Sequence, residues 1–590
     1  MGPTFGRGAM TNGWVDIKNT DMMLIMGGNP AENHPCGFKW PIEAKLHRNA
    51  KMIVVDPRFT RTAASADLFL QIRAGTDIAF LGGLINYALE HGHVARDYVV
   101  NYTNAAFIVK EGFKLPEDGL YSGFDASTQS YDKATWNYEG ADGSGRPGGS
   151  GGGTPASLPP NVAFDLSLQN PRCVFQLLKQ QYSRYTPEMV ERITGIPKDQ
   201  FLKAADLFTS IRKDGDMKKA ATIIYAVGWT QHTFGTQIIR TAAMLQLLLG
   251  NVGRAANIQG ATDMAGVFDS LPGYLKMPAP DDTDFATYLK RITPTSSKPS
   301  EWDSFNYWSN TPKFAVSFLK AMYGTAATKE HDWAFHFLPK IDRKHSWIEI
   351  WDDMYNGRVK GMLAFGMNGV AIGPNSRKNI DALKKADWLV VGEIYPDETS
   401  EFWRAPGTTA DEMKSIQTTV YRLPCAGFAE KDGNFVNSAR WLQWKNAALP
   451  PPGDARLDQD ILAQIYLNVQ DLYRKEGGAF PDPILNVRWP YTIPTSPALA
   501  EVAREINGQA LADVTDPATS STIKAGQQLP GFSYLRDDGS TLCGNWLYSG
   551  SWTEAGNQTA RRGTEDPSGL GIHANWGWSW PANRRVLYNR

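Results

Sequence analysis

The sequence has few cysteines, and none of them lie close enough together to form a metal cluster. The four cysteines, Cys36, Cys173, Cys425 and Cys543, include no C-x-x-C pair. Zinc knuckles, iron–sulfur clusters and redox dithiols all use closely spaced cysteines. We therefore expect none of these centres in the chain, and we interpret each cysteine as a small buried apolar residue.

An excess of either charge is also lacking, as is any long apolar run. Sixty basic and 61 acidic residues leave a formal net charge of −1, so no overall field favours nucleic acid or an anionic membrane surface. No apolar run approaches the length of a membrane span, and residues 1–18 contain neither a secretory h-region nor twin arginines. We expect no nucleic-acid partner, no direct membrane span and no export signal within this chain.

The common nucleotide-binding signatures are missing as well. There is no G-x-x-x-x-G-K-[ST] string, and the one G-x-G-x-x-G match, Gly143 to Gly148, lies in a segment dominated by glycine, serine and proline. That segment, residues 140–160, has the composition of a flexible surface insertion. Ordinary NAD and ATP sites are therefore disfavoured.

What the sequence does contain is an alternation of short apolar runs and helical patterns. The runs 22–26, 51–55 and 221–226 predict strands, and 38–49, 76–90 and 236–249 predict helices between and after them. A second unit begins near residue 360, with strands at 362–365 and 388–391 and a helix at 377–385. The pattern predicts an α/β protein with two doubly wound, Rossmann-like lobes and mainly parallel sheets.

We place the first lobe at residues 1–260 and the second at 261–590. The second lobe includes an aromatic segment, 262–357, for which we predict irregular structure, a helix at 458–475 and a tryptophan-rich tail.

Polar residues gather where the predicted strands of the first lobe end. In an open parallel sheet, ligands bind beyond the carboxyl ends of the strands, where loops and helix amino ends present free N–H groups. Arginines there can pair with a pyrophosphate, and carboxylates can accept hydrogen bonds from guanine or from ribose hydroxyls. The pattern favours a guanine or adenine nucleotide that belongs to a larger cofactor. The candidate residues are Gly28, Asn29, Glu32, Asp56, Arg58, Arg73, Gly75 and Asp77.

Several strings resemble the large subunits of molybdopterin guanine dinucleotide oxidoreductases. They are MGGNPAENHP (26–35), VDPRFTRTA (55–63), RAGTDIAFLGGL (73–84), GWTQHTFGTQ (228–237), GNVG (250–253) and NIQGATD (257–263). Within that superfamily, three further strings are most similar to respiratory, membrane-partnered formate dehydrogenases: PTFGRGAMTNGWVDIKN (3–19), EKDGNFVNSARWLQW (430–444) and DPSGLG (566–571). The resemblance covers nearly the whole chain.

The resemblance implies molybdenum or tungsten held by two molybdopterin guanine dinucleotides, one on each lobe. It adds Gly228, Thr230, Gln231 and Gln259 to the candidates for the first dinucleotide. For the second it implies Gly366, Asn368, Glu393, Thr399, Asn437 and Arg440. The family usually has G-x-N-P at the first of these second-lobe loops, whereas here Asn368 is followed by Gly369.

The chain departs from the formate dehydrogenase pattern in the residues that act on substrate. In that family a selenocysteine or cysteine ligand, followed by a histidine, lies shortly before the PTFGRG string, which only Met1-Gly2 precede here. Arg254-Ala255-Ala256 stands where the family has a longer loop with an active-site arginine. We therefore assign no catalytic and no metal-ligating residue, and we expect the isolated chain not to oxidise formate.

These departures suggest that the chain is an internal piece of a larger enzyme. It would lack the amino-terminal module with a [4Fe–4S] cluster and the carboxy-terminal β-barrel of a DMSO reductase-like fold. One hypothesis is that a selenocysteine codon was taken for a stop, and that Met1 is the next methionine. An in-frame TGA followed by a histidine codon just upstream would support it.

By the same resemblance, formate is the substrate, and the partners are an iron–sulfur electron-transfer subunit and a membrane cytochrome subunit, at the periplasmic side of the membrane. Two other interpretations stay open. The chain could be a noncatalytic molybdopterin-binding or scaffold protein, or it could belong to another molybdopterin oxidoreductase, such as a nitrate or polysulfide reductase.

Overall fold

The computed structural model describes most of the chain. The described residues are 13–117, 119–140, 162–213, 215–252, 258–260, 270–293, 310–343, 345–436, 441–516, 519–563 and 576–579. Several sequence-based predictions lie outside them: the insertion at 140–160 beyond its first residue, the PTFGRG and DPSGLG strings, Arg254, Asn437 and Arg440.

The amino-terminal part is built on a five-stranded parallel sheet in the order β3-β2-β1-β6-β7. After β1, the chain adds β2 and then β3 on one side, and it later adds β6 and β7 on the other side. The direction of winding therefore reverses between β1 and β6, which is where doubly wound folds bind their ligands. The strands are β1 (Met22–Met26), β2 (Lys51–Asp56), β3 (Leu68–Gln71), β6 (Ala221–Tyr225) and β7 (Ile258–Gly260).

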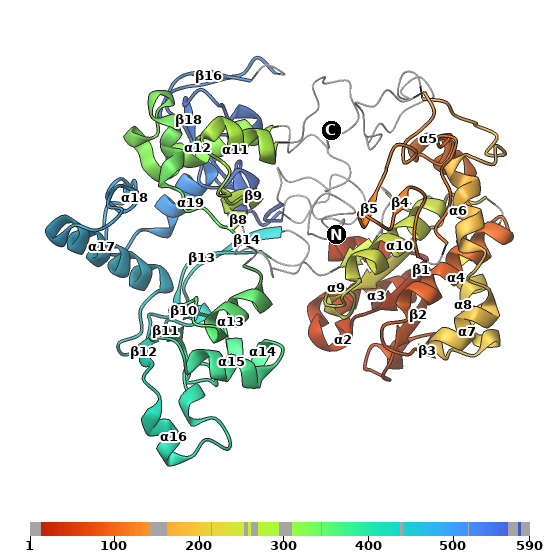
Figure 1. Cartoon of the computed structure of the whole chain (residues 1–590), viewed down its shortest axis with the longest axis horizontal. Coiled ribbons are helices and arrows are strands. Elements are labelled where there is room, and N and C mark those ends of the chain that lie inside the picture. Colours follow the sequence, from red (N-terminus) through yellow and green to blue (C-terminus); the bar gives the residue numbers. More distant parts are fainter. Residues whose placement is uncertain are drawn as a thin grey trace.

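Helices cover both faces of this sheet (Figure 1). Met22, Leu24 and Met26 of β1 pack against one set of helices, and Met23 and Ile25 pack on the opposite face. Because both faces are buried, the central strands are continuous apolar runs, as the sequence predicted. The first face is covered by α4 (Asp77–Glu90), α6 (Val174–Tyr182), α7 (Pro187–Thr194), α8 (Lys198–Thr209) and α10 (Gly235–Leu248), and the second by η1 (Trp14–Asn19) and α3 (Pro35–Arg48).

A second parallel sheet, in the order β10-β11-β12, lies in the carboxy-terminal half. Ala364, Leu389 and Val391 face a core formed with the helices α13, α14 and α15. On the opposite face Leu363 and Tyr421 are 46% and 54% exposed. The elements are β10 (Gly361–Phe365), β11 (Trp388–Glu393), β12 (Thr419–Pro424), α13 (Trp347–Tyr355), α14 (Gly369–Ile372) and α15 (Ser376–Leu383).

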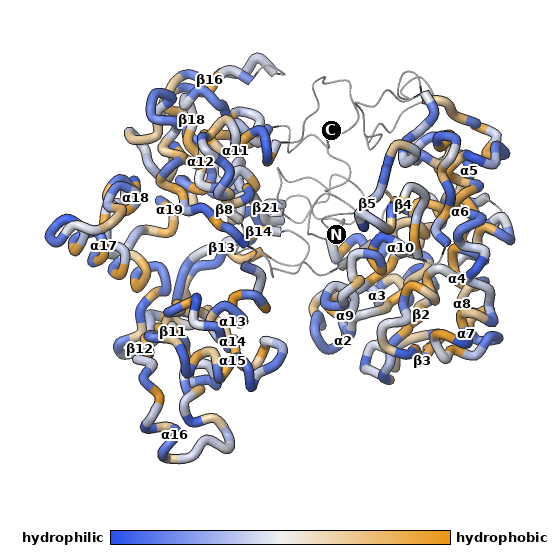
Figure 2. Tube along the Cα trace, in the orientation of Figure 1, coloured by the Kyte–Doolittle hydropathy of each residue, from blue (hydrophilic) through white to orange (hydrophobic). Residues whose placement is uncertain are grey.

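The aromatic segment 262–357 is more regular than the sequence predicted. Its described part contains α11 (Phe285–Ile292) and α12 (Thr311–Tyr323), as well as α13. Phe314 and Phe318 lie one helical turn apart on α12 and are buried together with Trp546 and Trp578 from near the carboxy end. The aromatic residues thus form a third core, which joins segments that are far apart in the chain, and its apolar residues show in Figure 2 around α11, α12 and β18 (Thr541–Leu542).

A small antiparallel sheet, in the order β13-β14-β21, adjoins this third core. The remaining longer elements include β13 (Gly433–Val436), β14 (Trp441–Lys445), α17 (Asp458–Glu476), α19 (Leu499–Asn507) and β21 (Trp578–Ser579). Within the described ranges, no helix has both the length and the apolar character needed to cross a bilayer. Cys173, Cys425 and Cys543 are buried as predicted, whereas Cys36 is exposed, because it lies in the first turn of α3.

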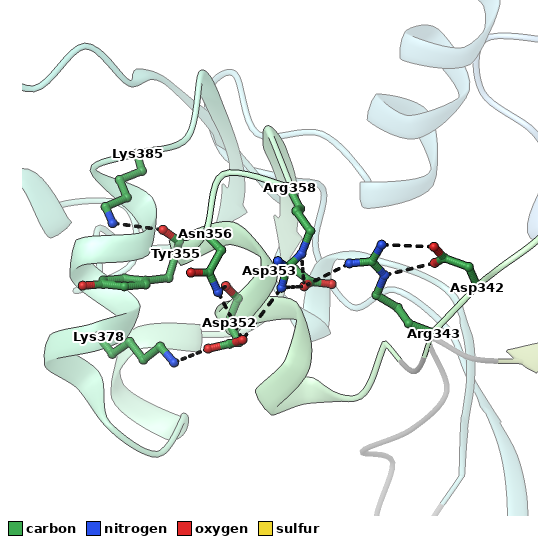
Figure 3. A network of polar contacts seen from close by, with 9 residues as sticks. All are labelled: Asp342, Arg343, Asp352, Asp353, Tyr355, Asn356, Arg358, Lys378 and Lys385. Carbon is green, nitrogen blue, oxygen red and sulfur yellow. Dashed lines mark hydrogen bonds and ion pairs between the residues drawn. The ribbon is translucent and has the colours of Figure 1, made fainter.

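A polar network joins α13 to α15 and to the chain that precedes α13 (Figure 3). The buried carboxylate of Asp353 accepts a hydrogen bond from Arg358 Nε at 2.6 Å, and Arg343 lies 3.8 Å away on its other side. Lys378 of α15 pairs with Asp352. Lys385 donates to the Tyr355 carbonyl at 3.0 Å and lies over the Tyr355 ring. Charged groups thus fix the carboxy-terminal part of α13 to α15 and to the chain that precedes α13.

Candidate functional site

The two central loops of the first sheet contact each other at the point where the winding reverses. The Gly27 carbonyl accepts hydrogen bonds from the backbone N–H groups of Ala226 (3.0 Å) and Gly228 (3.1 Å). A Cβ atom on Gly228 would lie 2.6 Å from the Gly27 oxygen, and one on Gly28 would lie 3.0 Å from the Ala226 Cβ. These glycines are therefore needed for the close approach of two loops, whether or not a ligand also lies against them.

Asn29, which follows these glycines, is held by a hydroxyl and a carboxylate. Its Oδ1 accepts a hydrogen bond from Thr62 Oγ1 at 2.7 Å, and its Nδ2 donates to Glu32 Oε2 at 2.5 Å. Thr62 Oγ1 also accepts from the N–H of Ala31 at 3.0 Å. Thr62 is fully buried and comes from the loop after β2. We call Asn29, Glu32 and Thr62 the first clasp.

Asp56 and Arg58 lie together at the end of β2. The Arg58 N–H donates to Asp56 Oδ1 at 2.8 Å. Burial raises the pKa of the Asp56 carboxyl, although the Arg58 N–H and guanidinium act in the opposite direction. Arg58 itself is exposed at the edge of the sheet. A carboxylate beside an exposed guanidinium can meet the donors of a base or ribose and the charge of a phosphate at the same time.

Asp77 connects α4 to the loop after β6. It is buried in the first turn of the helix, and its Oδ1 accepts from Trp229 Nε1 at 2.9 Å. Trp229 is fully buried and stacks on Tyr225, with ring centroids 4.9 Å apart. Burial raises the pKa of Asp77, whereas the Trp229 hydrogen bond and the His232 side chain act to lower it. Gly75 has a φ of +81°, and a Cβ atom on it would be in ordinary van der Waals contact with Phe234 at 3.7 Å and His232 at 3.9 Å.

The other first-lobe candidates have different surroundings. The Arg73 guanidinium donates to the carbonyls of Arg192 and Ile193, at 2.8 and 3.1 Å, so it binds the carboxyl end of α7. Thr230 and Gln231 lie at the end of the short helix α9 (Val227–Thr230), and Gln231 is exposed there. Gln259 pairs with Ile224 across β6 and β7, which places it near the same edge of the sheet; its side chain is outside the described set.

The second parallel sheet repeats the first clasp. Asn368 follows β10 as Asn29 follows β1, and its Oδ1 accepts from Thr399 Oγ1 at 2.9 Å. Thr399 Oγ1 in turn accepts from the N–H of Val370 at 3.0 Å. Asn368 Nδ2 donates to Glu398. We call Asn368, Glu398 and Thr399 the second clasp.

The correspondence extends along both loops. Gly27 and Gly366 both have positive φ, +73° and +65°, two residues before the asparagine of their clasp. Each asparagine begins a four-residue helix, α2 (Pro30–Asn33) in the first lobe and α14 in the second. Thr62 is the sixth residue after Asp56, the last residue of β2, and Thr399 is the sixth after Glu393, the last residue of β11.

Glu393 occupies the position in the second sheet that Asp56 has in the first. Its Oε1 is buried and has no hydrogen-bond partner within the described part of the chain. Burial raises the pKa of its carboxyl, and the nearby Asp397 raises it further. Cys425 lies next to it, because the Cys425 N–H donates to the Glu393 carbonyl at 3.1 Å. An unsatisfied buried carboxylate oxygen at this edge is the kind of group that a ligand donor would complete.

The candidate residues chosen from the sequence did not include Glu398 or Trp229, and Thr62 was noted only as a polar residue that follows Asp56 and Arg58. The equal spacing from Asp56 to Thr62 and from Glu393 to Thr399 was visible in the sequence and could have revealed Thr62 once Thr399 was selected. Nothing in the sequence showed that Trp229 donates to Asp77, a residue far away in the chain. Within the described ranges, no three histidine, cysteine or acidic side chains gather as a metal site would require.

The match to a known family extends over the first parallel sheet and over β10 and β11 of the second. A family described as "Molybdopterin oxidoreductase" matches residues 3–402, which include the loops after β1, β2, β6, β10 and β11. The chain belongs to the molybdopterin oxidoreductase family. The predicted recognition and α/β fold class are thereby confirmed, and so is the molybdopterin part of the predicted cofactor.

Curated members of this family resemble the chain over its full length. It is 49% identical to the formate dehydrogenase-O major subunit of Escherichia coli (strain K12), of which it covers 57%. It is 43% identical to the formate dehydrogenase 2 subunit alpha (cytochrome c-553) of Nitratidesulfovibrio vulgaris, of which it covers 56%. The chain thus spans little more than half the length of these relatives. Among solved structures, acetylene hydratase from Pelobacter acetylenicus is similar with a TM-score of 0.41 and 16% identity, over 81% of this chain and 51% of its own.

The residues at the two edges fit a molybdopterin that ends in a nucleotide. Glu393 presents a buried, unsatisfied acceptor that suits the N–H donors of a base or the hydroxyls of a ribose. Among the described residues, no atom lies within 4 Å of the position of a Cβ atom on Gly366, which leaves space for a ligand next to the backbone there. At the corresponding edge of the first sheet Arg58 presents an exposed guanidinium, a group that can pair with a phosphate.

Proposed function

We propose that this chain binds two molybdopterin guanine dinucleotides, with molybdenum or tungsten, as part of a formate dehydrogenase catalytic subunit. The observation that carries the proposal is the repeat of one loop geometry at the carboxyl ends of two separate parallel sheets, within a chain of the molybdopterin oxidoreductase family. Two similar loops are what two copies of one ligand require. The close identity to formate dehydrogenase major subunits supports formate as substrate.

In this proposal the two lobes extend over residues 1–260 and 261–590, and each holds one dinucleotide. Asp56 and Glu393 accept hydrogen bonds from the guanine edge or the ribose, and Arg58 pairs with the pyrophosphate. Gly28, Gly75, Gly228 and Gly366 let the ligand approach the backbone. When bound, the metal–dithiolene group supplies the two-electron chemistry that converts formate to carbon dioxide, and the chain's residues bind and orient that group.

The electrons would leave through an iron–sulfur subunit and a membrane cytochrome subunit on the periplasmic side. The name of one relative, formate dehydrogenase 2 subunit alpha (cytochrome c-553), is consistent with electron transfer of this kind. The partners and the location remain part of the proposal, since the identity of this chain to its relatives covers just over half of their length.

The test is a cofactor analysis followed by an activity assay. The chain is purified from cells that make the cofactor, and metal, pterin and released guanine nucleotide are measured per chain. We expect two guanine nucleotides per chain; a purified, folded chain that carries no guanine nucleotide would contradict the binding proposal.

Substrate is tested on the full-length enzyme of which this chain is proposed to be a part, because no catalytic or metal-ligating residue is assigned in the chain itself. Formate-dependent reduction of a viologen dye is expected. If the same preparation instead oxidises the reduced dye with nitrate or polysulfide and does not use formate, the family assignment stands but the substrate assignment is wrong.

A further inference from the structure

We infer that the buried hydroxyls of Thr62 and Thr399 are positioning groups, each of which sets the shape of one dinucleotide-binding loop. This inference rests on the proposed function, because it assigns the cofactor to these loops. It assigns a role to Thr62, which was not among the candidate residues, and it gives Thr399, Asn29 and Asn368 a role other than the direct cofactor contact that was expected of them.

Each threonine hydroxyl makes the same two hydrogen bonds. Thr62 Oγ1 donates to Asn29 Oδ1 (2.7 Å) and accepts from the N–H of Ala31 (3.0 Å). Thr399 Oγ1 donates to Asn368 Oδ1 (2.9 Å) and accepts from the N–H of Val370 (3.0 Å). In both loops the N–H belongs to the second residue after the asparagine. One hydroxyl thus ties a side chain and a backbone group of the loop to the next strand's loop.

Both threonines are fully buried, so water cannot replace these bonds at little cost. A buried hydroxyl that donates and accepts in fixed directions can hold a loop in one conformation. The loops it holds begin with a glycine of positive φ and lead into a four-residue helix, which is too short to be stable alone.

The carboxylate of each clasp comes from a different position in the sequence relative to its asparagine and threonine. Glu32, which accepts from Asn29 Nδ2, is the third residue after that asparagine, whereas Glu398, which accepts from Asn368 Nδ2, directly precedes Thr399. The same contact is thus made from different positions in the two lobes. A contact that two differently built loops share points to a common requirement of the ligand rather than to local packing.

A consequence concerns the asparagines. Their oxygens accept from threonine and from loop N–H groups, and their amide nitrogens donate to a carboxylate. These bonds fix the orientation of both amides. The asparagines therefore hold their loops, and the ligand meets the loop backbone and the carboxylates Asp56 and Glu393 rather than the amide oxygens.

The experiment counts guanine nucleotides per folded chain in threonine variants of the full chain, purified from cells that make the cofactor. Valine has the shape of threonine without the hydroxyl, so Thr62→Val and Thr399→Val should each lower the count from two to about one, and the double variant should hold almost none. Thr62→Ser and Thr399→Ser keep the hydroxyl and should retain two.

Matched controls come from buried threonines away from the loops. Thr209, in the first lobe, bonds to the Ala205 carbonyl and to His93, and Thr541, in the third core, bonds to Ser317 and to the Arg536 N–H. Thr209→Val and Thr541→Val lose comparable bonds and should keep two nucleotides.

Two nucleotides retained in both Thr62→Val and Thr399→Val would overturn the inference, and so would an equal loss in the control variants. If Thr62→Val yields no folded chain, Asn29→Ala removes the other end of the same contact. One nucleotide in that variant supports the inference, and two overturn it. Absence of guanine nucleotide from the wild-type chain would instead count against the proposed function itself.

Discussion

At the scale of single residues, the contact between Trp229 and Asp77 links two of the loops at the first site. Asp77 lies in the first turn of α4, where a negative charge is favourable, and Trp229 brings the β6 loop to it. Burial nevertheless raises the pKa of this carboxyl. The hydrogen bond from the Trp229 indole thus partly offsets the cost of burying the Asp77 carboxylate. The same bond fixes the loop after β6 against α4.

The raised pKa predicts a specific pH dependence. A carboxyl with a higher pKa in the native state binds its proton more tightly there. Its contribution to the free energy of unfolding is therefore fully present below the ordinary pKa near 3.8, and it is lost as pH rises through the native pKa. We expect the free energy of unfolding of the wild type, relative to that of Asp77→Asn, to fall over this window and then stay level.

Urea unfolding at a series of pH values measures this difference. In Asp77→Asn the amide oxygen can still accept from Trp229, so the charge is the main change. A constant difference between the two proteins across the acidic range would show that the Asp77 pKa is not raised.

Gly228 offers a steric test of the same loops. A Cβ atom there would lie 2.6 Å from the Gly27 carbonyl oxygen, a backbone atom that cannot swing aside. We expect Gly228→Ala to lower the free energy of unfolding by about 1–3 kcal/mol, as overpacking usually does. The control is Gly531→Ala, because Gly531 is extended and no atom of the described residues lies within 4 Å of its Cβ position. Equal urea midpoints for the two variants would contradict the close approach of the loops.

At the scale of elements, the sequence identified the apolar strands β1, β2, β6, β10 and β11 and missed the more exposed edge strands β3 and β12. β1, β2 and β6 are buried on both faces, so each is a continuous apolar run. β3 and β12 form edges of their sheets and are largely half-exposed or exposed, so their residues, LFLQ and TVYRLP, show no such run. A strand whose sequence does not have to be apolar can be found only through its pairing partner.

The residues of the candidate site could likewise be predicted only where they adjoin an apolar strand. Loops that directly follow apolar strands, such as those at Asn29, Asp56 and Glu393, could be selected from sequence because the ends of parallel strands meet at one edge. The contacts of Arg73 could not be predicted from its position after a strand. Its guanidinium binds the carboxyl end of α7, more than a hundred residues later, and that contact is a property of the folded chain.

The position of α13 depends on the polar network of Figure 3. Asp353 is 5% exposed and accepts from Arg358 Nε at 2.6 Å. Asp353→Asn keeps the shape but removes the charge that faces two arginines, and we expect a loss of about 1–3 kcal/mol in the free energy of unfolding. Thermal melts measure it. Asp411→Asn is the control, because that side chain is 97% exposed and lies 3.7 Å from Lys414; it should change stability by less than about 0.5 kcal/mol.

At the scale of the whole molecule, the two clasps belong to different cores. The first lies against the sheet of β1 and β2, and the second against the core of β10 and β11. A ligand that binds only the native state stabilises it by mass action, by about 2.7 kcal/mol at a hundred times its dissociation constant. Two ligands held by two cores should therefore stabilise two separate regions of the chain.

Hydrogen exchange can resolve these regions. We expect the chain made in cells that cannot synthesise the dinucleotide to exchange faster at residues 27–33 and at 366–372 than the loaded chain does, because both loops lose a ligand. Helix α12 belongs to the third core, bonds to neither clasp among the described residues and should exchange at the same rate in both. Slower exchange on loading at only one loop would mean that a single dinucleotide binds. If loading changes the exchange rate at neither loop, the repeated clasps only stabilise the fold. A ligand that is bound by a loop should slow the exchange of that loop's amides.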